Sequence, residues 1–446
     1  MQFLIKPSSV EGGVFKVTLQ NTLTATTKIE FVSVSFSAIT APTAAHGSSI
    51  YIDASDSPHF LLSSLALGTG TDGSASAVFV KGELHEIVTS STFTGTTKDE
   101  ANLNLMFGTV TSTVFTDSSS VTNDNVCGRV VEFPCTGWAT AASKLASSAL
   151  THSLQVVSSQ TISSAQSFTK ATTISQVSSS ASKVTITLSQ LDVSVASYFS
   201  SSAALTFSKL NIVLPPTLSS LSVDSLISTT AILTIADCDF TQSVATALSS
   251  NLINLSPSTT TVISNTAFTS LSFTDKSPIS AATGAKQAAI SNTDFTTIAR
   301  TGGDGGVVSA VLTASHSLTL TSNVFIDVTC SSASAIGGAV FASLDASASL
   351  YIDSCTFKGC VATDTSSGTN STGGGMRLTL LPSFAGEYII SAPVFLTPTT
   401  NNANYGKDLF ISSYKLTEDI GTGSVLFDTT GDTSQDRFDL SANRVR

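Results

Sequence analysis

The chain has 446 residues, of which 41% are hydrophobic and only 11% are charged. Such a chain is too apolar to be disordered and too poor in Lys, Glu and Arg to cover many amphipathic helices, so Ser and Thr must form most of its solvated surface. The formal net charge is −11, and because no basic track is present we expect no nucleic-acid partner. No stretch of about 18 apolar residues predicts a membrane span.

The first residues, Met1 to Val10, lack the basic start and apolar stretch of a signal peptide. The chain is therefore either cytosolic or a section of a longer polypeptide whose signal and anchor lie elsewhere.

Weak copies of a strand pattern follow at residues 29–36, 88–93 and 110–115. Because alternate residues of a strand share a face, we expect Phe115 to point inward. The repeated strand pattern predicts that residues 1–121 form an N-terminal β-helical section.

The pattern breaks between about residues 117 and 140, where Cys127, Cys135 and the only tryptophan, Trp138, occur. The two cysteines either form a disulfide in an oxidising compartment or remain unpaired thiols. Residues 139–150 are rich in alanine and predict a short helix, placed where it could cover the open end of a second β-helix. We place a domain boundary near residue 121 and assign residues 122–446 to a main β-helix.

A template of four inward positions, h-x-h-x-x-h-x-h, recurs along this main section. The terminal Phe residues of its last five copies are 28, 27, 30 and 32 residues apart, a drifting period that suits stacked coils with one elastic loop each. The copies are Ile186, Leu188, Leu191, Val193; Leu205, Phe207, Leu210, Ile212; Leu233, Ile235, Cys238, Phe240; Thr261, Ile263, Thr266, Phe268; Ala288, Ile290, Thr293, Phe295; Leu318, Leu320, Asn323, Phe325; and Leu350, Ile352, Cys355, Phe357.

The two-residue gap inside each copy predicts a bend. The second residue of the gap is of a type that tolerates a left-handed backbone or bonds its own main chain, namely Asp237, Asn265, Asn292, Ser322 and Ser354. Coils stacked at about 4.8 Å would place each Phe over the next and would bury Cys238 and Cys355 at one inward position. The sequence therefore predicts an all-β fold, a right-handed parallel β-helix solenoid.

Two glycine-rich segments begin strands one coil apart, Gly337-Gly-Ala-Val340 and Gly373-Gly-Gly-Met376. They resemble the GGA[ILV] repeat of the polymorphic outer-membrane proteins of chlamydiae and of related right-handed β-helix surface proteins of protists. The partner motif FxxN is absent, since Phe325 is followed by Ile-Asp-Val and Phe357 by Lys-Gly-Cys. This departure points to the protist relatives.

Two further segments resemble pectin-lyase-like β-helices. Cys127-Gly128 with Pro134-Cys135 is similar to their entry segment, and residues 404–409 are similar to a coil near the end of such arrays. The resemblance covers about residues 122–415. It implies a secreted or surface-displayed solenoid, often one section of a much larger protein.

Two groups of charged residues are candidates for ligand binding. Asp239 and Asp294 occupy one outward template position two coils apart, or roughly 10 Å, near the upper limit for an inverting carboxylate pair. Arg300 and Asp304, beside the loop 302–306, could bind an acidic sugar or form a solvated loop pair. Asn370 begins an Asn-Ser-Thr sequon for glycosylation.

These groups assemble no recognisable catalytic cluster, and none of the six cysteines has the CxxC spacing of a zinc site. We expect no catalytic residue, no metal and no cofactor. The sequence favours a non-enzymatic adhesive or structural surface, extracellular or on the cell surface, that binds glycans or surface proteins. The alternatives are a divergent polysaccharide lyase or hydrolase of the pectin-lyase fold, or an intracellular scaffold if the chain is complete.

Overall fold

The computed structural model describes most of the chain between residues 112 and 413, together with short strands outside this span. Contacts divide the chain into two compact units, Met1–Ser158 and Ser159–Arg446. The predicted boundary near residue 121 lies outside the described residues and stays a prediction. The described span comprises residues 112–118, 128, 134–143, 145, 149–177, 182–189, 197–215, 225–243, 246–255, 259–281, 287–333, 335–366, 370–391, 393–395 and 401–413.

The first unit contains parallel strand pairs, which is the pairing that a solenoid requires. The strands are β1 (Phe15–Thr18), β4 (Ile50–Asp53) and β7 (Val78–Lys81) in one sheet, β2 (Glu30–Phe31) and β5 (Leu61–Leu62) in another, β3 (Ser35–Phe36), β6 (Ala66–Leu67) and β8 (Thr92–Phe93) in a third, and β9 (Thr113–Thr116) paired with β10 (Thr151–Val156).

Two predictions for this unit need correction. On β9, Val114 and Thr116 are fully buried whereas Phe115 is only partly covered, so the prediction that Phe115 faces inward is wrong. A one-residue error in a period of two exchanges the two faces of a strand. The predicted helix is present as α2 (Trp138–Ser143) but does not continue to residue 150. Leu150, the last residue of the predicted helix, is 89% exposed, so its apolar side chain gains no burial that would favour a helix there.

The second unit is a parallel β-solenoid whose three sheets are each built from one strand per coil. The first sheet contains β13 (Ala171–Gln176), β16 (Leu205–Ser208), β19 (Ile232–Ala236), β22 (Thr260–Ser264), β25 (Gln287–Ser291), β28 (Ser317–Thr321), β31 (Ser349–Asp353), β35 (Glu387–Ser391) and β38 (Ser424–Leu426).

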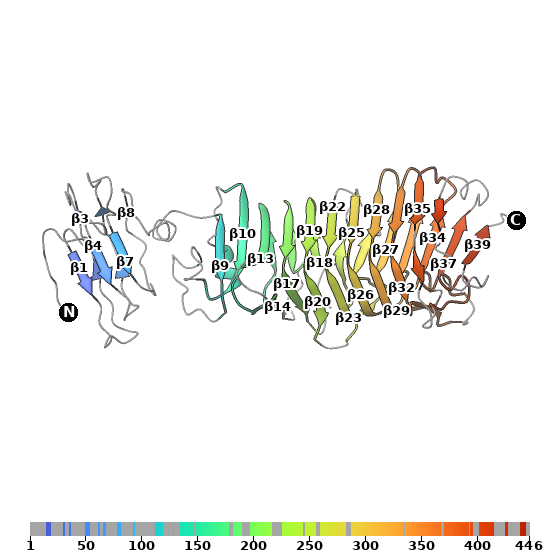
Figure 1. Ribbon diagram of the computed structural model, residues 1–446, viewed down its shortest axis with the longest axis horizontal. Coiled ribbons are helices and arrows are strands. Elements are labelled where there is room, and N and C mark those ends of the chain that lie inside the picture. The colour runs from blue at the N-terminus through green and yellow to red at the C-terminus, as the bar shows by residue number, and fades with distance from the viewer. Residues whose placement is uncertain are drawn as a thin grey trace. The chain divides into compact units, whose positions relative to one another are not determined.

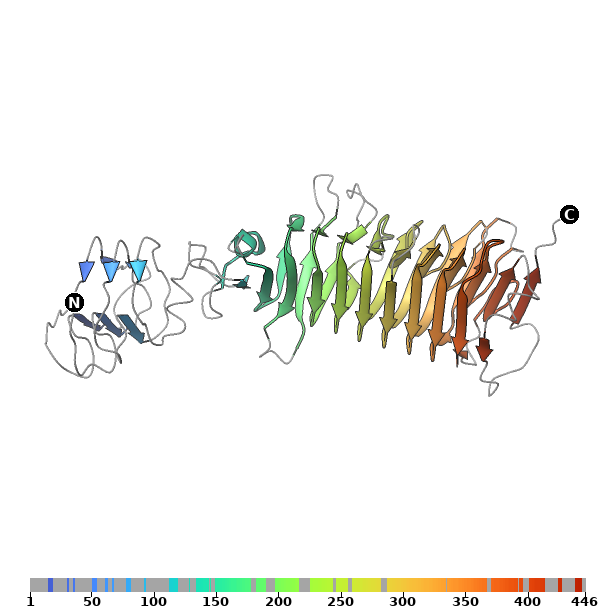
Figure 2. The same ribbon diagram turned by 90° about the horizontal axis from the view of Figure 1, so that it is seen from above.

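The second sheet contains β11 (Gln160–Ile162), β14 (Val184–Leu188), β17 (Leu210–Leu214), β20 (Asp239–Gln242), β23 (Ala267–Thr274), β26 (Asp294–Thr301), β29 (Val324–Ser332), β32 (Thr356–Lys358) and β36 (Val394–Phe395), with β33 (Val361–Asp364) paired to β29. The third contains β12 (Gln166–Phe168), β15 (Phe199–Ser201), β18 (Ser225–Thr229), β21 (Asn251–Asn254), β24 (Ile279–Ala281), β27 (Val308–Leu312), β30 (Val340–Leu344), β34 (Met376–Leu380), β37 (Leu409–Ser413) and β39 (Phe438–Ala442). Figures 1 and 2 show these strands as successive rungs, coloured from green to red.

A ladder of five phenylalanines runs through the core along the second sheet. The rings of Phe240, Phe268, Phe295, Phe325 and Phe357 are all fully buried. Neighbouring rings are stacked with centroids 4.8 to 5.0 Å apart and planes within 10° of parallel. The predicted Phe ladder is confirmed, because in-register parallel pairing places each ring one strand spacing from its equivalent.

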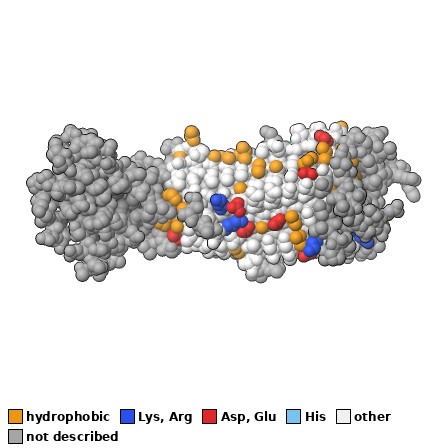
Figure 3. Space-filling view, in the orientation of Figure 1, with side chains coloured by type: hydrophobic (Ala, Val, Ile, Leu, Met, Phe, Trp, Pro, Cys, Tyr) orange, Lys and Arg blue, Asp and Glu red, His pale blue; other side chains and the backbone are white. Residues whose placement is uncertain are grey.

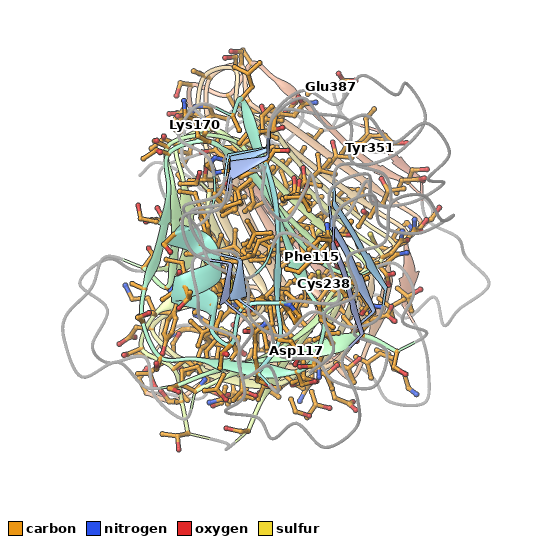
Figure 4. All side chains as sticks on the ribbon, turned by 90° about the vertical axis from the view of Figure 1, so that its left-hand side faces the viewer. Phe115, Asp117, Lys170, Cys238, Tyr351 and Glu387 are labelled. Atoms are coloured by element: carbon orange, nitrogen blue, oxygen red, sulfur yellow. The ribbon has the colours of Figure 1, made fainter. Side chains whose placement is uncertain are left out.

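The predicted bend residues are also confirmed. All five have a left-handed backbone, with φ between 47° and 54°, at Asp237, Asn265, Asn292, Ser322 and Ser354. The next residue of each coil points inward, and this position holds small or polar side chains that are almost fully buried, namely Cys238, Thr266, Thr293, Asn323 and Cys355. Figure 4 looks along the stack and shows Cys238 inside it, with Tyr351 and Glu387 on the outer surface.

The polar members of this buried row bond their neighbours. Asn323 Nδ2 donates to the carbonyl oxygen of Ile290 at 2.9 Å, and its Oδ1 accepts from the amide of Thr293 at 3.0 Å. Thr266 Oγ1 donates to the carbonyl oxygen of Ser264 at 2.9 Å. Because a buried polar group without a partner costs free energy, these bonds explain why polar residues are tolerated inside the corner.

The first predicted copy of the template is out of phase. Ile186 pairs with Ile212 of the second sheet, whereas the template aligned it with Leu205. Thr172 and Ile174 of β13 instead pair with Leu205 and Phe207. The period-two alternation is the same in every strand of a coil, so the pattern could not tell which strand of the coil Ile186 occupies.

Removing one ring from the ladder should destabilise the solenoid. We expect Phe268→Ala to lower the free energy of unfolding by about 3–5 kcal/mol, because it leaves a cavity and deletes two ring stacks. The control is Tyr351→Ala, at a side chain that is 38% exposed, where a much smaller change is expected. Urea unfolding followed by circular dichroism measures both, and equal losses would contradict the ladder as a main source of stability.

Candidate functional site

Stacked glycine turns form one corner of the solenoid, before the strands of the third sheet. The first glycine of each turn has a positive φ, as seen at Gly305, Gly337, Gly373 and Gly406, with values of 74°, 69°, 65° and 54°. This backbone region favours glycine because it has no Cβ. The amides of Gly305, Gly337 and Gly373 each donate at 2.9 Å to the residue before the glycine of the next coil.

The second glycine of each turn is required by close stacking. A Cβ added at Gly306 would lie 2.3 Å from the carbonyl oxygen of Gly338, and one at Gly338 would lie 1.8 Å from that of Gly374. The GG pair of the sequence motif therefore has two separate physical roles, a left-handed turn and a close backbone contact between coils.

The turns bring two rows of side chains to the same corner. Residues just before the first glycine form one row, Asp304, Ile336, Thr372 and Tyr405, linked by bridges between Ile336 and Thr372 and between Thr372 and Tyr405. Outward residues of the following strands form the other row, which runs in register through Ser309, Phe341, Arg377 and Phe410. We call Asp304, Ile336, Phe341, Thr372, Arg377 and Tyr405 the corner cluster.

Arg377 is held in place from three directions. Its Nη1 donates to Thr372 Oγ1 at 2.6 Å, its Nε donates to Thr379 Oγ1 at 3.2 Å, and its guanidinium lies over the ring of Phe410 with the centroid 5.1 Å away. Burial lowers the pKa of Arg377, but an arginine remains charged at any physiological pH. These contacts fix a cation that is only partly covered.

Arg300 points into the turn and not toward the outer surface. It is 6% exposed, and its guanidinium donates to the carbonyl oxygens of Asp304, of Gly305 at 2.6 Å and of Asp275 at 3.3 Å. Its Nε is buried without a hydrogen-bond partner. Arg300 and Asp304 therefore lie together, but Arg300 is not the solvated member of a loop pair, because its contact is with the main chain; a ligand role for Arg300 stays a prediction.

Asp304 is a partly buried carboxylate in the field of two arginines. Burial raises its pKa, while the charges of Arg300 and Arg377 lower it, and the net direction is upward. No hydrogen bond to its carboxylate is present within the described part of the chain. The carboxylate oxygens can therefore still accept hydrogen bonds from a ligand, and they lie where contact with water is reduced.

The other predicted pair, Asp239 and Asp294, lies on one outward row of the second sheet with Ala267 between them, as the template predicted. Asp239 is engaged by Lys183, whose Nζ lies 2.8 Å from it and 3.2 Å from Asp237. Asp294 is exposed and belongs to no such triad among the described residues. Lys183 contacts only one member of the pair, and a ligand role for Asp239 and Asp294 stays a prediction.

The free cysteines among the described residues are core residues. Cys238, Cys330, Cys355 and Cys360 are fully buried, and burial raises the pKa of Cys238 to about 12 and that of Cys330 to about 11. The predicted burial of Cys238 and Cys355 as small core residues is confirmed.

Two predictions concern modification. Cys135 is disulfide-bonded, but Cys127 lies outside the described residues, so their pairing stays a prediction. Asn370 is exposed, and its backbone N–H donates to Asp364 Oδ2 at 2.9 Å. The side chain offered for glycosylation is thus on the surface.

Among the described residues, no group of three or more His, Cys, Asp or Glu side chains is placed to hold a metal ion. Likewise, the described helices include none that is long and apolar enough to cross a membrane.

The sequence missed the aromatic part of the corner cluster. Phe341 and Tyr405 of the cluster, and Phe410 beside it, follow no common template in the chain, and their proximity results from the glycine turn. The usable signal was the distance from the glycines, since Phe341, Arg377 and Phe410 each occur four residues after a glycine of positive φ.

A side chain at the second glycine should damage the corner. We expect Gly338→Ala to destabilise the chain by about 2–3 kcal/mol, because its Cβ would overlap the neighbouring coil. Gly137→Ala is the control, since an added Cβ there meets nothing within 4 Å, and we expect about 1 kcal/mol or less. The urea midpoint compares the two, and a tolerated Gly338→Ala would contradict the stacked-turn geometry.

The raised pKa of Asp304 predicts a pH-dependent cost. A carboxyl group whose pKa is higher in the folded state than in the unfolded state does not destabilise the protein at a pH below both values. The folded state loses stability as the pH rises from the unfolded pKa through the folded pKa. Asp304→Asn should therefore raise the melting temperature at pH 7, and the gain should vanish at about pH 2, well below the ordinary pKa of aspartic acid, where the side chain is protonated in both states. A gain of equal size at both pH values would contradict this account.

No family model, no curated protein and no solved structure matches this chain.

Proposed function

We propose that this chain is a non-enzymatic solenoid, secreted or displayed on a cell surface, whose outer faces serve as an adhesive or structural surface. In this proposal it is one section of a larger protein, related to pectin-lyase-like β-helix surface proteins that carry GGA[ILV] repeats of the protist type. Glycans or surface proteins are its partners, and nucleic acid is not.

The observation that carries the proposal is the row structure of the outer faces. On the second sheet, Thr241, Thr269 and Thr296 stand side by side on adjacent strands. Because the strands are in register, such hydroxyl groups repeat at about 4.8 Å. A repeating row of donors and acceptors suits an extended, hydroxyl-rich partner better than a single small substrate.

The first sheet adds a broad uncharged face. None of its strands β13, β16, β19, β22, β25 and β28 contains a charged residue. Figure 3 shows that, on the face it views, charged side chains gather in a few places between large uncharged areas. Such a surface favours contact with neutral partners, because no charge has to be desolvated.

Two features support an extracellular location. Cys135 is disulfide-bonded, and disulfides persist in oxidising compartments. Asn370, the first residue of an Asn-Ser-Thr sequon, is exposed, as glycosylation in a secretory compartment requires.

The alternative is a divergent polysaccharide lyase or hydrolase, based on the Asp239–Asp294 pair. Such an enzyme needs one carboxyl group as acid and another as base or nucleophile. In this chain, Lys183 contacts both Asp237 and Asp239, so Asp239 is already engaged by a neighbouring cation of the chain. We therefore favour the adhesive surface.

The test is retention of the purified chain on immobilised neutral and acidic glycans, with released sugar measured in parallel. We expect the protein to be retained on at least one glycan class without releasing sugar. Release of soluble sugar would establish the enzyme, and no retention on any glycan would contradict glycan adhesion.

A further inference from the structure

The corner cluster offers a binding site more specific than the repeating faces. Resting on the proposed adhesive function, we propose that it binds a neutral saccharide. One sugar ring lies across Ile336 and Phe341, one hydroxyl donates to the carboxylate of Asp304, and another accepts from the guanidinium of Arg377.

Unused hydrogen-bonding capacity at both ends supports this site. Within the described residues, the carboxylate of Asp304 accepts no hydrogen bond, and the bonds of Arg377 come from Nε and Nη1, leaving Nη2 unused. A sugar hydroxyl is both a donor and an acceptor, so one kind of group satisfies the carboxylate and the guanidinium alike. Charge-assisted bonds of this kind are also the stronger ones.

The spacing of the two groups fits one sugar ring. Asp304 precedes β27 and Arg377 lies on β34, two coils further along, which corresponds to roughly 10 Å. Two hydrogen bonds of about 2.8 Å leave about 4 Å between the ligand oxygens, a separation that non-adjacent hydroxyls of one ring can span. A single hydroxyl is too small to bridge the pair.

The middle coil supplies an apolar floor. Ile336 and Phe341 lie between the two charged groups, and both are partly exposed. The turn packs tightly beneath them, since a Cβ added at Gly305 would lie 3.0 Å from Phe341 Cβ. Aromatic and aliphatic side chains cover the C–H face of a sugar ring while polar groups at the rim fix its orientation.

A second aromatic residue extends the site by one coil. Tyr405 pairs with Thr372 beyond Arg377 and is 50% exposed. From Asp304 to Tyr405 the row covers three coil spacings, or about 14 Å, which is enough for two linked sugar rings. The inferred ligand is therefore an oligosaccharide and not a free monosaccharide.

Charge selects a neutral sugar. The rim presents one carboxylate and one guanidinium, and Arg300 directs its donors to carbonyl oxygens beneath the turn. An acidic sugar, which the sequence offered as a ligand for Arg300 and Asp304, would be repelled by the carboxylate of Asp304. It would not gain Arg300 as a partner, because the donors of Arg300 are directed to carbonyl oxygens beneath the turn. The net charge of −11 further disfavours a polyanion.

The experiment measures affinity of the full chain and four variants for the neutral oligosaccharide best retained on the array, by titration calorimetry. Asp304→Asn removes the acceptor charge and Tyr405→Ala removes the outer ring. Their matched controls are Asp327→Asn, an exposed aspartate on β29 of the second sheet, and Tyr351→Ala, an exposed tyrosine on the first. Melting temperatures confirm that all four variants are folded.

We expect a loss of about tenfold or more for Asp304→Asn and severalfold for Tyr405→Ala, with both controls within a factor of two of wild type. Equal affinity of all variants would overturn the site while leaving glycan adhesion standing. Retention on acidic glycans alone would also overturn the neutral-sugar site but not adhesion. A wild-type chain retained on no glycan would overturn both.

Discussion

The in-register stacking of coils is the constraint on which the rest of this structure depends. Each strand pairs with its equivalent one coil away, so every side chain lies about 4.8 Å from the residue at the same position of the next coil. Positions that repeat a flat ring form the Phe240–Phe357 ladder, with centroids near 5 Å apart. Positions where a side chain would overlap the neighbouring coil hold glycine in successive coils. Stability therefore accumulates between neighbouring coils, as it does in other repeat proteins.

In-register stacking also explains which features of the fold could be predicted from the sequence. The Phe spacing and the Asn, Asp and Ser bends were predictable, because each is set by a local backbone or ring requirement. Two assignments failed, at Ile186 and at Phe115, because period-two alternation does not identify which strand of a coil a segment occupies or which face is inward. The predicted helix after Trp138 is too long, because alanine content alone does not show whether a helix has an apolar face to bury.

The candidate site was predictable only in part. Arg300 and Asp304 were singled out beside a glycine loop, and the structure brings them together, but with Arg300 under the turn. The contacts of Arg377 with Thr372 and Phe410 arise from the turn and from pairing between coils. A row of side chains that meets only after three coils have stacked has no signature in any short stretch of sequence. The solenoid thus builds its most distinctive surface from residues that are about 30 residues apart in the chain.

A crystal structure of the chain would show the register of the stacked coils. We expect parallel pairing of successive coils, with the rings of Phe240, Phe268, Phe295, Phe325 and Phe357 stacked inside at about 5 Å. We also expect Asp304 and Arg377 at one corner with Phe341 between them. Antiparallel pairing in this region, or a register that places these rings on the outer face, would contradict the account and the proposed binding surface with it.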